Sequence, residues 1–351
     1  MSQYWHLKPF SNPAFCVLPF YGIEYPANTP CCLLKPGYNL TDVKNQMLAG
    51  IKPSSCNTCW KLEDAGITSD RQLKNQSLDF YLDRDIRGIV DDCEAGLNSI
   101  IHYKIDTSNV CNGTCVTCNS YCSSSWAQLE RKHKTANVPR RWQIKTKQLN
   151  IGYATARSIG FRGGEPLLSS TNFDILENLL KHGNDSCFIN FTTNGSLAIT
   201  DYQKNLLRQF KHVNFCFSID GIGPVFEYLR FPLKWDTLLE NIEYCRQNGI
   251  LVSTSYTVSN MNVLYHNETM SWFNKNSSEV VTNPVNFPSY FRPNALPLAV
   301  KKQMPQAFFT PHTDADDTDF ARFLVEIQRQ DTMKRISIAK YLPKFYTLIN
   351  T

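Results

Sequence analysis

"VCNGTCVTCN", residues 110–119, places Cys111, Cys115 and Cys118 in the spacing C-x₃-C-x₂-C. A structural zinc ion takes four protein ligands and a disulfide takes two cysteines, so three clustered thiols fit neither. An iron–sulfur cluster is normally held by four thiolates, and three leave one iron open to an external molecule. The stretch therefore predicts a catalytic metal site with one coordination position kept free.

The cysteine content of the whole chain agrees with metal binding. There are 13 cysteines in 351 residues, which is many for a reducing compartment, where disulfides seldom persist. The odd number also excludes complete pairing. Three cysteines stand singly in apolar stretches and are expected to be buried as small hydrophobic residues: Cys187, Cys216 and Cys245. The clustered cysteines indicate metal instead.

Length and composition are those of a globular protein with one large α/β domain or two to three smaller ones. Hydrophobic residues make up 42% of the chain and charged residues 19%, and the net charge is +5. The sequence contains no run of about 18 apolar residues, so it predicts no membrane-spanning helix. The N-terminus has no basic start followed by an apolar stretch, so it is no signal peptide. We therefore expect a cytoplasmic protein with no membrane partner.

One dense basic stretch, "RKHKTANVPRRWQIKTK", covers residues 131–147. Lys and Arg at this density bind an acidic partner or a phosphate backbone in some proteins. A solvated helix and loop is the simpler interpretation, and we do not expect a nucleic-acid partner.

From about residue 100 the sequence alternates strand-like and helical runs. The strand-like runs are residues 99–108, 156–162, 187–195, 212–221, 250–259 and 279–286. Strands that alternate with helices of this length predict a parallel sheet with helical crossovers. About six βα units are expected, fewer than the eight of a closed barrel. The predicted fold class is therefore α/β, with a partial (β/α)₆ TIM-like barrel.

Unusual residues follow the carboxyl ends of four of these strands. They are the cysteine loop, "GGEP" at residues 163–166, "TTNG" at 192–195 and "SIDG" at 218–221. Loops at the carboxyl ends of parallel strands form the active site in α/β folds. All four stretches are therefore expected on one rim of the barrel.

These motifs, in this order, resemble those of radical S-adenosylmethionine (radical SAM) enzymes over roughly residues 100–300. "DTSNVCNGTC" is similar to the strand-to-cluster stretch of that family, and "FRGGEPLL" to its GGE motif. The resemblance implies that Cys111, Cys115 and Cys118 hold a [4Fe–4S] cluster whose open iron is chelated by S-adenosylmethionine (SAM). It further implies reductive cleavage of SAM to a 5′-deoxyadenosyl radical, which abstracts hydrogen from a substrate.

The resemblance also implies which residues bind SAM. A carboxylate suits the methionine ammonium, and glycines let the backbone approach a ligand closely. The implied SAM-binding residues are Gly163, Gly164, Glu165, Thr193, Asn194, Ser218, Asp220 and Arg230. For Arg230 a salt bridge is the alternative role. One departure is Thr117, since the family usually has an aromatic residue before the third cysteine.

Two other interpretations use the same cysteines. Cys115 and Cys118 alone form a C-x-x-C pair, which is a redox dithiol in some βα folds. Cys122 could also complete a four-thiolate set for structural zinc or an electron-transfer cluster. Both leave "GGEP" and "SIDG" at the matching strand ends as coincidences. We therefore favour the radical SAM interpretation, in which Cys122 is not a metal ligand.

A second group of cysteines precedes the barrel, and its surroundings resemble the auxiliary-cluster modules called SPASM and twitch. Those modules usually follow the barrel. The complete SPASM pattern has more cysteines, so a single-cluster twitch with ligands Cys16, Cys32, Cys56 and Cys59 is expected. Cys31 is the alternative to Cys32, and zinc is the alternative to a second [4Fe–4S] cluster. Cys93 is interpreted as structural.

These observations divide the chain into an auxiliary-cluster domain (1–97), a radical SAM barrel (98–300) and a helical C-terminal extension (301–351). The leading prediction is a radical SAM oxidoreductase or maturase that acts on a peptide or protein. A nucleotide, sugar or small metabolite is the alternative substrate, because fold does not determine substrate. A non-enzymatic zinc- or cluster-binding interaction module is the alternative of a different class. Expected partners are SAM and an electron donor such as flavodoxin or ferredoxin; no catalytic acid or base is assigned.

Overall fold

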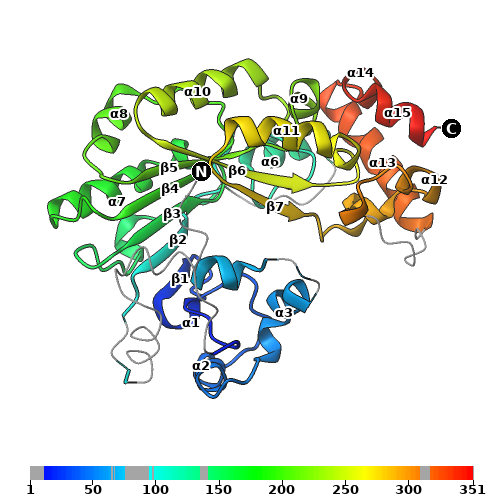
Figure 1. Cartoon of the computed structure of the whole chain (residues 1–351). Helices are drawn as coiled ribbons and strands as arrows, with labels where there is room; N and C mark the ends of the chain where they lie inside the picture. The colour runs from blue at the N-terminus through cyan, green and yellow to red at the C-terminus, as the bar shows by residue number, and fades with distance from the viewer. Residues whose placement is uncertain are drawn as a thin grey trace.

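The computed structural model describes residues 12–64, 66, 68–75, 95–96, 99–134, 141–308 and 317–350. Its centre is a seven-stranded parallel sheet whose strands follow one another in chain order. The crossover helices lie along the upper side of this sheet in Figure 1, and the cysteine-rich N-terminal segment lies below it. The predicted α/β fold with a partial barrel is confirmed.

Six of the seven strands fall within the six strand-like runs of the sequence. They are β2 (His102–Asp106), β3 (Ser158–Arg162), β4 (Phe188–Thr193), β5 (Val213–Ser218), β6 (Leu251–Val258) and β7 (Val280–Pro284). The crossovers contain α6 (Ser124–His133), α7 (Ser170–Lys181), α8 (Asp201–Leu207), α9 (Pro224–Leu229), α10 (Trp235–Gln247) and α11 (His266–Asn276).

The remaining strand, β1 (Gly22–Tyr25), comes from the cysteine-rich segment and corrects the expected six-stranded barrel. It pairs in parallel with β2, so that Glu24 lies opposite Lys104. Lys104 Nζ and Glu24 Oε1 form an ion pair of 3.0 Å across this edge. A strand of four residues is too short to show periodicity in the sequence. The sheet therefore continues from the barrel into the N-terminal segment.

Helices, most of them short, make up much of the described secondary structure at both ends of the chain. The N-terminal segment contains α1 (Leu18–Tyr21), α2 (Leu40–Leu48) and α3 (Asn57–Asp64). The C-terminal part contains α12 (Leu298–Lys301), α13 (Asp317–Lys334), α14 (Ile338–Tyr341) and α15 (Pro343–Ile349), as the predicted helical tail requires. The 3₁₀ helices are η1 (Ser54–Cys56), η2 (Thr146–Gln148), η3 (Pro166–Leu168), η4 (Val263–Tyr265), η5 (Ser289–Phe291), η6 (Pro293–Ala295) and η7 (Gln306–Phe308).

The two faces of the sheet differ in polarity. On the outer face, the rings of Phe191 and Phe215 stack with centroids 5.3 Å apart, and Phe173 of α7 packs on Phe191 at 6.0 Å. On the inner face, Asn214 Nδ2 donates to Asn190 Oδ1 at 2.6 Å and to Ser253 Oγ at 2.8 Å. Apolar and polar side chains alternate along these strands, which fixes the register of strand pairing and leaves a polar inner face.

The three solitary cysteines divide between these two environments. Cys187 and Cys245 are fully buried, as expected. Cys216 is only half-buried, because it belongs to the polar inner face of β5, where Ser253 of β6 lies opposite. Cys93 lies outside the described residues.

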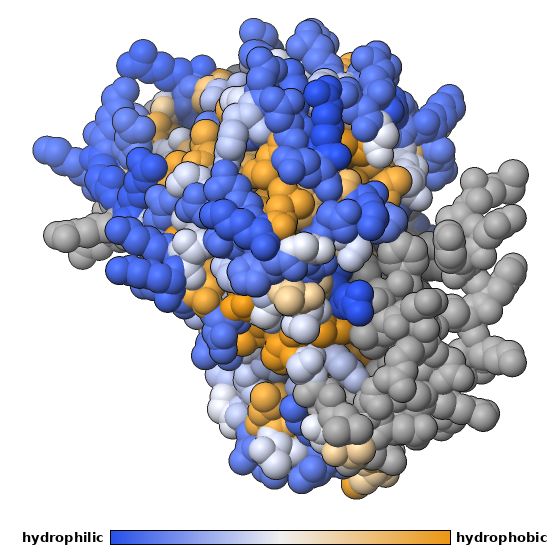
Figure 2. Space-filling model, turned by 90° about the vertical axis from the view of Figure 1, so that its left-hand side faces the viewer, coloured by the Kyte–Doolittle hydropathy of each residue, from blue (hydrophilic) through white to orange (hydrophobic). Residues whose placement is uncertain are grey.

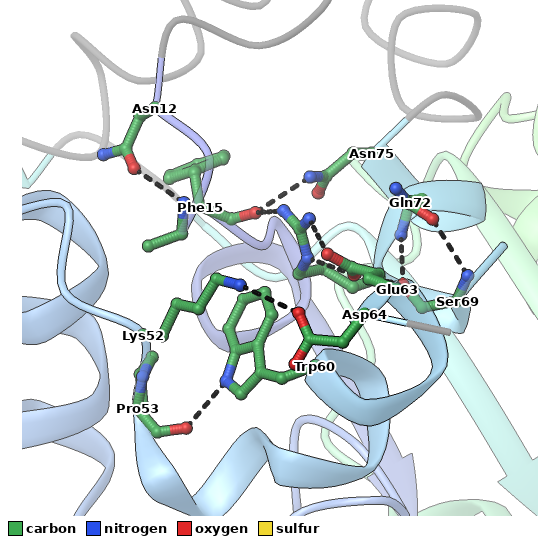
Figure 3. Close-up of polar contacts among 12 residues, drawn as sticks. Asn12, Phe15, Lys52, Pro53, Trp60, Glu63, Asp64, Ser69, Gln72 and Asn75 are labelled. Atoms are coloured by element: carbon green, nitrogen blue, oxygen red, sulfur yellow. Dashed lines mark hydrogen bonds and ion pairs between the residues drawn. The ribbon is translucent and has the colours of Figure 1, made fainter. Parts of the chain in front are cut away.

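Polar contacts around Trp60 hold the N-terminal segment together (Figure 3). Trp60 Nε1 donates to the Pro53 carbonyl at 2.8 Å, and the Arg71 guanidinium lies 4.7 Å from the Trp60 ring centroid. The same guanidinium donates to both carboxylate oxygens of Glu63, at 2.8 and 2.6 Å, and to the Phe15 carbonyl at 2.6 Å. Bidentate bonds of this kind are among the strongest in proteins, so they tie the start of the segment to α3.

Hydrophilic residues cover most of the face in Figure 2, with hydrophobic residues showing between them along its middle. Exposed apolar residues are normal on soluble domains. Among the described residues, no helix is both long enough and apolar enough to cross a membrane.

Candidate active site

The three predicted cluster ligands lie on the loop that leaves β2 for α6. Cys111, Cys115 and Cys118 are all half-buried. A Cβ atom on Gly113 would lie 3.4 Å from Cys115 Sγ and 3.8 Å from Cys111 Sγ. Gly113 therefore lets the chain pass close beneath two of the three sulfur atoms.

Side chains at the start of α6 hold this loop, called the cluster loop (residues 107–123), by donating hydrogen bonds to its backbone carbonyl groups. Ser123 caps the helix and donates from Oγ to the Gly113 carbonyl at 2.6 Å. Ser125 Oγ donates to the Cys111 carbonyl at 2.7 Å, and Trp126 Nε1 donates to the Cys115 carbonyl at 2.8 Å. These three side chains, which follow the cysteines in the sequence, thus fix the position of the cluster loop.

The GGE turn after β3 is hydrogen-bonded to the same loop. Gly164 N–H donates to the Ser108 carbonyl at 2.8 Å, and Glu165 N–H donates to the Val110 carbonyl at 2.7 Å. A Cβ atom on Gly164 would collide with the Val110 carbonyl, and Gly163 has φ +103°. The glycines are therefore required for contact between the turn and the cluster loop, a role that the sequence motif alone did not predict.

Glu165 joins the GGE turn to the loop after β4. Its side chain is only 1% exposed. Oε1 accepts hydrogen bonds from Thr193 Oγ1 at 2.7 Å and from Leu167 N–H at 3.2 Å. Oε2 accepts one from Asn194 N–H at 2.8 Å. Burial raises the pKa of Glu165, and the bonds from Asn194, Thr193 and Leu167 oppose this rise.

The loop after β4 is in turn linked back to the cluster loop. Asn194 Nδ2 donates to Asn112 Oδ1 at 2.8 Å, and Asn112 Nδ2 donates to Ser196 Oγ at 2.8 Å. The sequence analysis did not single out Asn112, although it lies between the first two cysteines. Three predicted stretches thus form one hydrogen-bonded rim, as their positions at the strand ends led us to expect.

Asp220, in the "SIDG" stretch after β5, pairs with Arg230. Arg230 Nε lies 2.7 Å from Asp220 Oδ2 and Nη2 donates to Oδ1 at 3.0 Å. The side chains are 13% and 4% exposed, so this is a buried ion pair. Burial is the largest single influence and lowers the pKa of Arg230, but Asp220 and the charges of Cys115 and Cys118 together raise it, so that the net pKa is raised. Arg230 Nη1 lies 4.0 Å from Cys115 Sγ, which brings the guanidinium to the cluster loop.

Two further residues of the rim lie at the carboxyl end of β5 and after β6. Ser218 is the half-buried last residue of β5, opposite Ser255 of β6. Asn262 is fully buried and donates from Nδ2 to the carbonyls of Asp220 at 2.7 Å and Thr257 at 2.8 Å. Sequence reasoning missed Asn262, although an amide after a parallel strand was a usable signal.

Cys122, near the end of the cluster loop, interacts with the predicted ligand Cys118. A hydrogen bond between the two thiols raises the pKa of Cys118 and lowers the pKa of Cys122 to about 7. Cys122 itself is exposed. Within the described ranges, no three or more His, Cys, Asp or Glu side chains lie close enough to hold a single metal ion.

Four of the N-terminal cysteines line a small pocket. Cys16, Cys31, Cys56 and Cys59 line it, together with apolar side chains and Arg71. Cys32 is exposed and is not among the lining residues. Burial raises the pKa of the Cys56 and Cys59 thiols. The pocket thus gathers three of the four predicted ligands, together with Cys31, which was the alternative to Cys32.

The donors on the cluster loop fit an iron–sulfur cluster. Soft thiolates are the ligands such clusters take, and a thiolate-ligated cluster is anionic. Three thiols on one loop supply those ligands, and the Arg230 guanidinium lies 4.0 Å from one of them. The chemistry of the donor atoms therefore agrees with the group.

Comparisons with known proteins agree with this geometry. Residues 105–275 match the Radical SAM superfamily. Among curated proteins, none matches the chain. Residues 105–275 run from β2 into α11 and include the cluster loop, the GGE turn and Arg230.

Solved structures give weaker likenesses. Native anSMEcpe with bound AdoMet is 16% identical with a TM-score of 0.42, over 66% of this chain and 62% of that one. Streptococcus suis SuiB bound to S-adenosylmethionine is 14% identical with a TM-score of 0.39, over 79% and 57%. SuiB bound to precursor peptide SuiA is 13% identical with a TM-score of 0.38, over 86% and 65%.

This chain spans less than two thirds of each of these proteins, and at such TM-scores the likeness carries no conclusion about function. The superfamily match implies a [4Fe–4S] cluster and SAM. Residues 105–275 therefore form a Radical SAM superfamily domain, and the match to this superfamily supports an enzyme.

Proposed function

We propose that the protein cleaves SAM reductively at a [4Fe–4S] cluster held by Cys111, Cys115 and Cys118. When bound, the cluster and SAM supply a 5′-deoxyadenosyl radical, which takes a hydrogen atom from the substrate. The observation that carries this proposal is the joining of the cluster loop to the GGE turn by two backbone hydrogen bonds, inside the matched domain. The single electron comes from a donor such as flavodoxin or ferredoxin.

The residues of the rim are proposed to bind and orient SAM. Glu165 already accepts three hydrogen bonds, and a carboxylate has about four lone-pair sites. Its proposed role is to hold the turn at residues 163–165 in shape, with one acceptor site left for the methionine ammonium. Thr193 and Asn194 support that turn from β4, and Ser218 and Asp220 lie where the ribose is proposed to bind. Arg230 is the proposed partner of the SAM carboxylate, with Asp220 orienting its guanidinium.

A second cluster is proposed in the pocket of the N-terminal segment. Cys16, Cys56 and Cys59 keep their predicted role, and Cys31 takes the place first given to Cys32, because Cys31 lines the pocket. A [4Fe–4S] cluster is favoured, with zinc as the alternative, since both take tetrahedral thiolate. Iron analysis of the purified protein distinguishes the two metals.

The proposed substrate class is a peptide or protein. The support is the likeness of the N-terminal segment to auxiliary-cluster modules, together with the polar inner face of the sheet. That face presents amide and hydroxyl groups, including Asn190, Asn214 and Ser253, which hydrogen-bond the amide groups of a peptide readily. A nucleotide, sugar or small metabolite is the alternative that substrate screening tests.

The test is anaerobic reconstitution with iron and sulfide, followed by dithionite and SAM. We expect roughly eight irons per chain, as two four-iron clusters require, and formation of 5′-deoxyadenosine. Cys115→Ala should abolish the product and lower the iron content by about half. Cys122→Ala is the matched control and should retain both. Loss of the metal bound to the cluster loop in Cys122→Ala, or tight zinc without any 5′-deoxyadenosine, would instead support a closed, non-enzymatic site.

A further inference from the structure

The C-terminal helix α13 contacts the cluster loop directly, although more than 200 residues separate them. Gln330 Nε2 donates to the Val116 carbonyl at 3.1 Å, across a sequence separation of 214 residues. The neighbouring carbonyl, that of Cys115, accepts the bond from Trp126 Nε1. Two successive carbonyls of the loop are therefore held by side chains of α13 and α6.

Lys334 lies one turn beyond Gln330 on the same face of α13. It is only 6% exposed. Its Nζ donates to Gln330 Oε1 at 2.8 Å and lies 4.5 Å from the centroid of the Trp126 ring. A cation over an indole ring is attracted by the ring electrons, and Trp126 is the residue that binds the Cys115 carbonyl. Lys334 is thus packed behind the cluster loop.

No carboxylate forms an ion pair with Lys334 within the described part of the chain. The two acidic residues nearest to it on α13 are engaged elsewhere. Glu326 pairs with Arg329 at 2.7 Å. Asp331 accepts hydrogen bonds from Tyr228 Oη at 2.9 Å and from Ile338 N–H at 2.7 Å. The ammonium is therefore a buried cation without an ion-pair partner among the described residues, although Asp331 and Glu326 attract it at longer range.

Burying a charge without a counter-ion is unfavourable. Burial accordingly lowers the pKa of Lys334 to about 7, and the negative charge of a Cys115 thiolate is the largest influence that opposes this. Arg230, the other cation beside Cys115, is neutralised by Asp220. The cluster loop thus has one nearby cation that is paired and one that is not.

We propose that Lys334 is the counter-cation of the cluster on Cys111, Cys115 and Cys118, and that it stabilises the reduced form of that cluster. This inference rests on the proposed function. A cluster held by thiolates is negatively charged, and the electron from the external donor adds one more negative charge to it. A fixed cation in a poorly solvated site stabilises the more negative form more strongly. The net charge around a cluster is one of the factors that set its reduction potential.

The test is a redox titration of reconstituted protein, monitored by electron paramagnetic resonance without SAM. The barrel cluster is identified as the signal that Cys115→Ala abolishes. Lys334→Met removes the charge at similar length, and Lys334→Arg keeps a charge. Lys344→Met is the matched control, because Lys344 is an exposed lysine of α15 that also lies over an aromatic ring, 5.9 Å from the centroid of Tyr265.

We expect Lys334→Met to shift the midpoint potential of the barrel cluster to a lower value, and Lys334→Arg to restore most of it. Lys344→Met should leave the potential unchanged. Loss of barrel iron in Lys334→Met with retention in Lys334→Arg would support the same conclusion, since the charge alone differs.

An unchanged potential in Lys334→Met with intact iron would overturn the inference, and so would equal loss of iron in both Lys334 variants, which indicates packing alone. A wild-type protein without any Cys115-dependent cluster would overturn the proposed function, and this inference with it. These outcomes are distinguished by the iron content and the spectrum of the wild-type protein.

Discussion

Glu165 Oε1 accepts a hydrogen bond of 2.7 Å from Thr193 Oγ1, although the two residues follow different strands of the sheet. Both are almost completely buried. The bond connects the turn after β3 to the loop after β4, and the same turn is bound to the cluster loop after β2. Three loops are thereby held in one arrangement by a single carboxylate and the backbone beside it.

Glu165→Gln is expected to destabilise the protein by about 1–3 kcal/mol, because the new amide places a donor where Asn194 N–H or Thr193 Oγ1 now donates. SAM affinity should fall in parallel, since the rim loses its shape. Denaturant unfolding and SAM titration measure the two effects. Glu177→Gln on α7, where the carboxylate binds only the exposed Tyr202 hydroxyl among the described contacts, should change neither. Equal stability of both variants would contradict the proposed role.

Gly164→Ala is expected to displace the cluster loop, because its Cβ atom would meet the Val110 carbonyl. Overpacking of this kind costs about 1–3 kcal/mol, and the barrel cluster should be lost on reconstitution. Gly160→Ala, in β3 just before the turn, is the matched control, since the nearest atom to its Cβ would be 3.8 Å away. Thermal unfolding and iron analysis compare them; normal iron in Gly164→Ala would show that the close contact is dispensable.

Cys31→Ala is expected to lower the iron content of the pocket in the N-terminal segment, whereas Cys32→Ala should leave that iron content unchanged. The reason is positional: Cys31 lines the pocket with Cys16, Cys56 and Cys59, and Cys32 does not. Iron and zinc analysis of both variants, each in otherwise wild-type protein, measures the difference. The reverse result would restore Cys32 as the fourth ligand.

Protein stability is expected to fall as the pH drops below about 6.5, the ordinary pKa of histidine, because of His102. This side chain is 7% exposed; its pKa lies well below the usual value, mainly because of burial and then because of Lys74, Lys104 and Arg162. The unfolded chain therefore takes up a proton that the folded chain does not, and each pH unit costs about 1.4 kcal/mol until the folded pKa is reached.

His102→Gln should flatten this dependence, whereas His133→Gln on the exposed end of α6 should not. Urea midpoints between pH 8 and pH 5 provide the measurement. A wild-type slope that persists in His102→Gln would assign it to other groups.

Much of the barrel could be predicted because its signals are local. Alternation within β4 and helical spacing within α7 are visible in a short window of sequence. The cluster loop, the GGE turn, "TTNG" and "SIDG" each follow a predicted strand, and parallel strands place their carboxyl ends at one edge. That rule brought Glu165 and Asp220 to the same rim before any contact between them and their partners was known.

Other features were beyond the sequence because they depend on contacts between distant segments. β1 shows no periodicity of its own and is a strand only because β2 offers it hydrogen bonds. Adjacent Cys31 and Cys32 are equivalent in sequence, and only the turn of the chain makes Cys31 face the pocket. Asn112 and Asn262 looked like ordinary loop residues until their partners were present.

The sequence by itself determined the parallel α/β sheet, the three thiols after its first barrel strand and the rim on which the motifs gather. Those features follow from short-range periodicity and from the common direction of the strands. Tertiary structure alone decided that Arg230 pairs with Asp220, and that α13 brings Gln330 and Lys334 behind the cluster loop. The physical reason is that charge pairing and burial depend on which groups share a low-dielectric space, and chain order does not specify that.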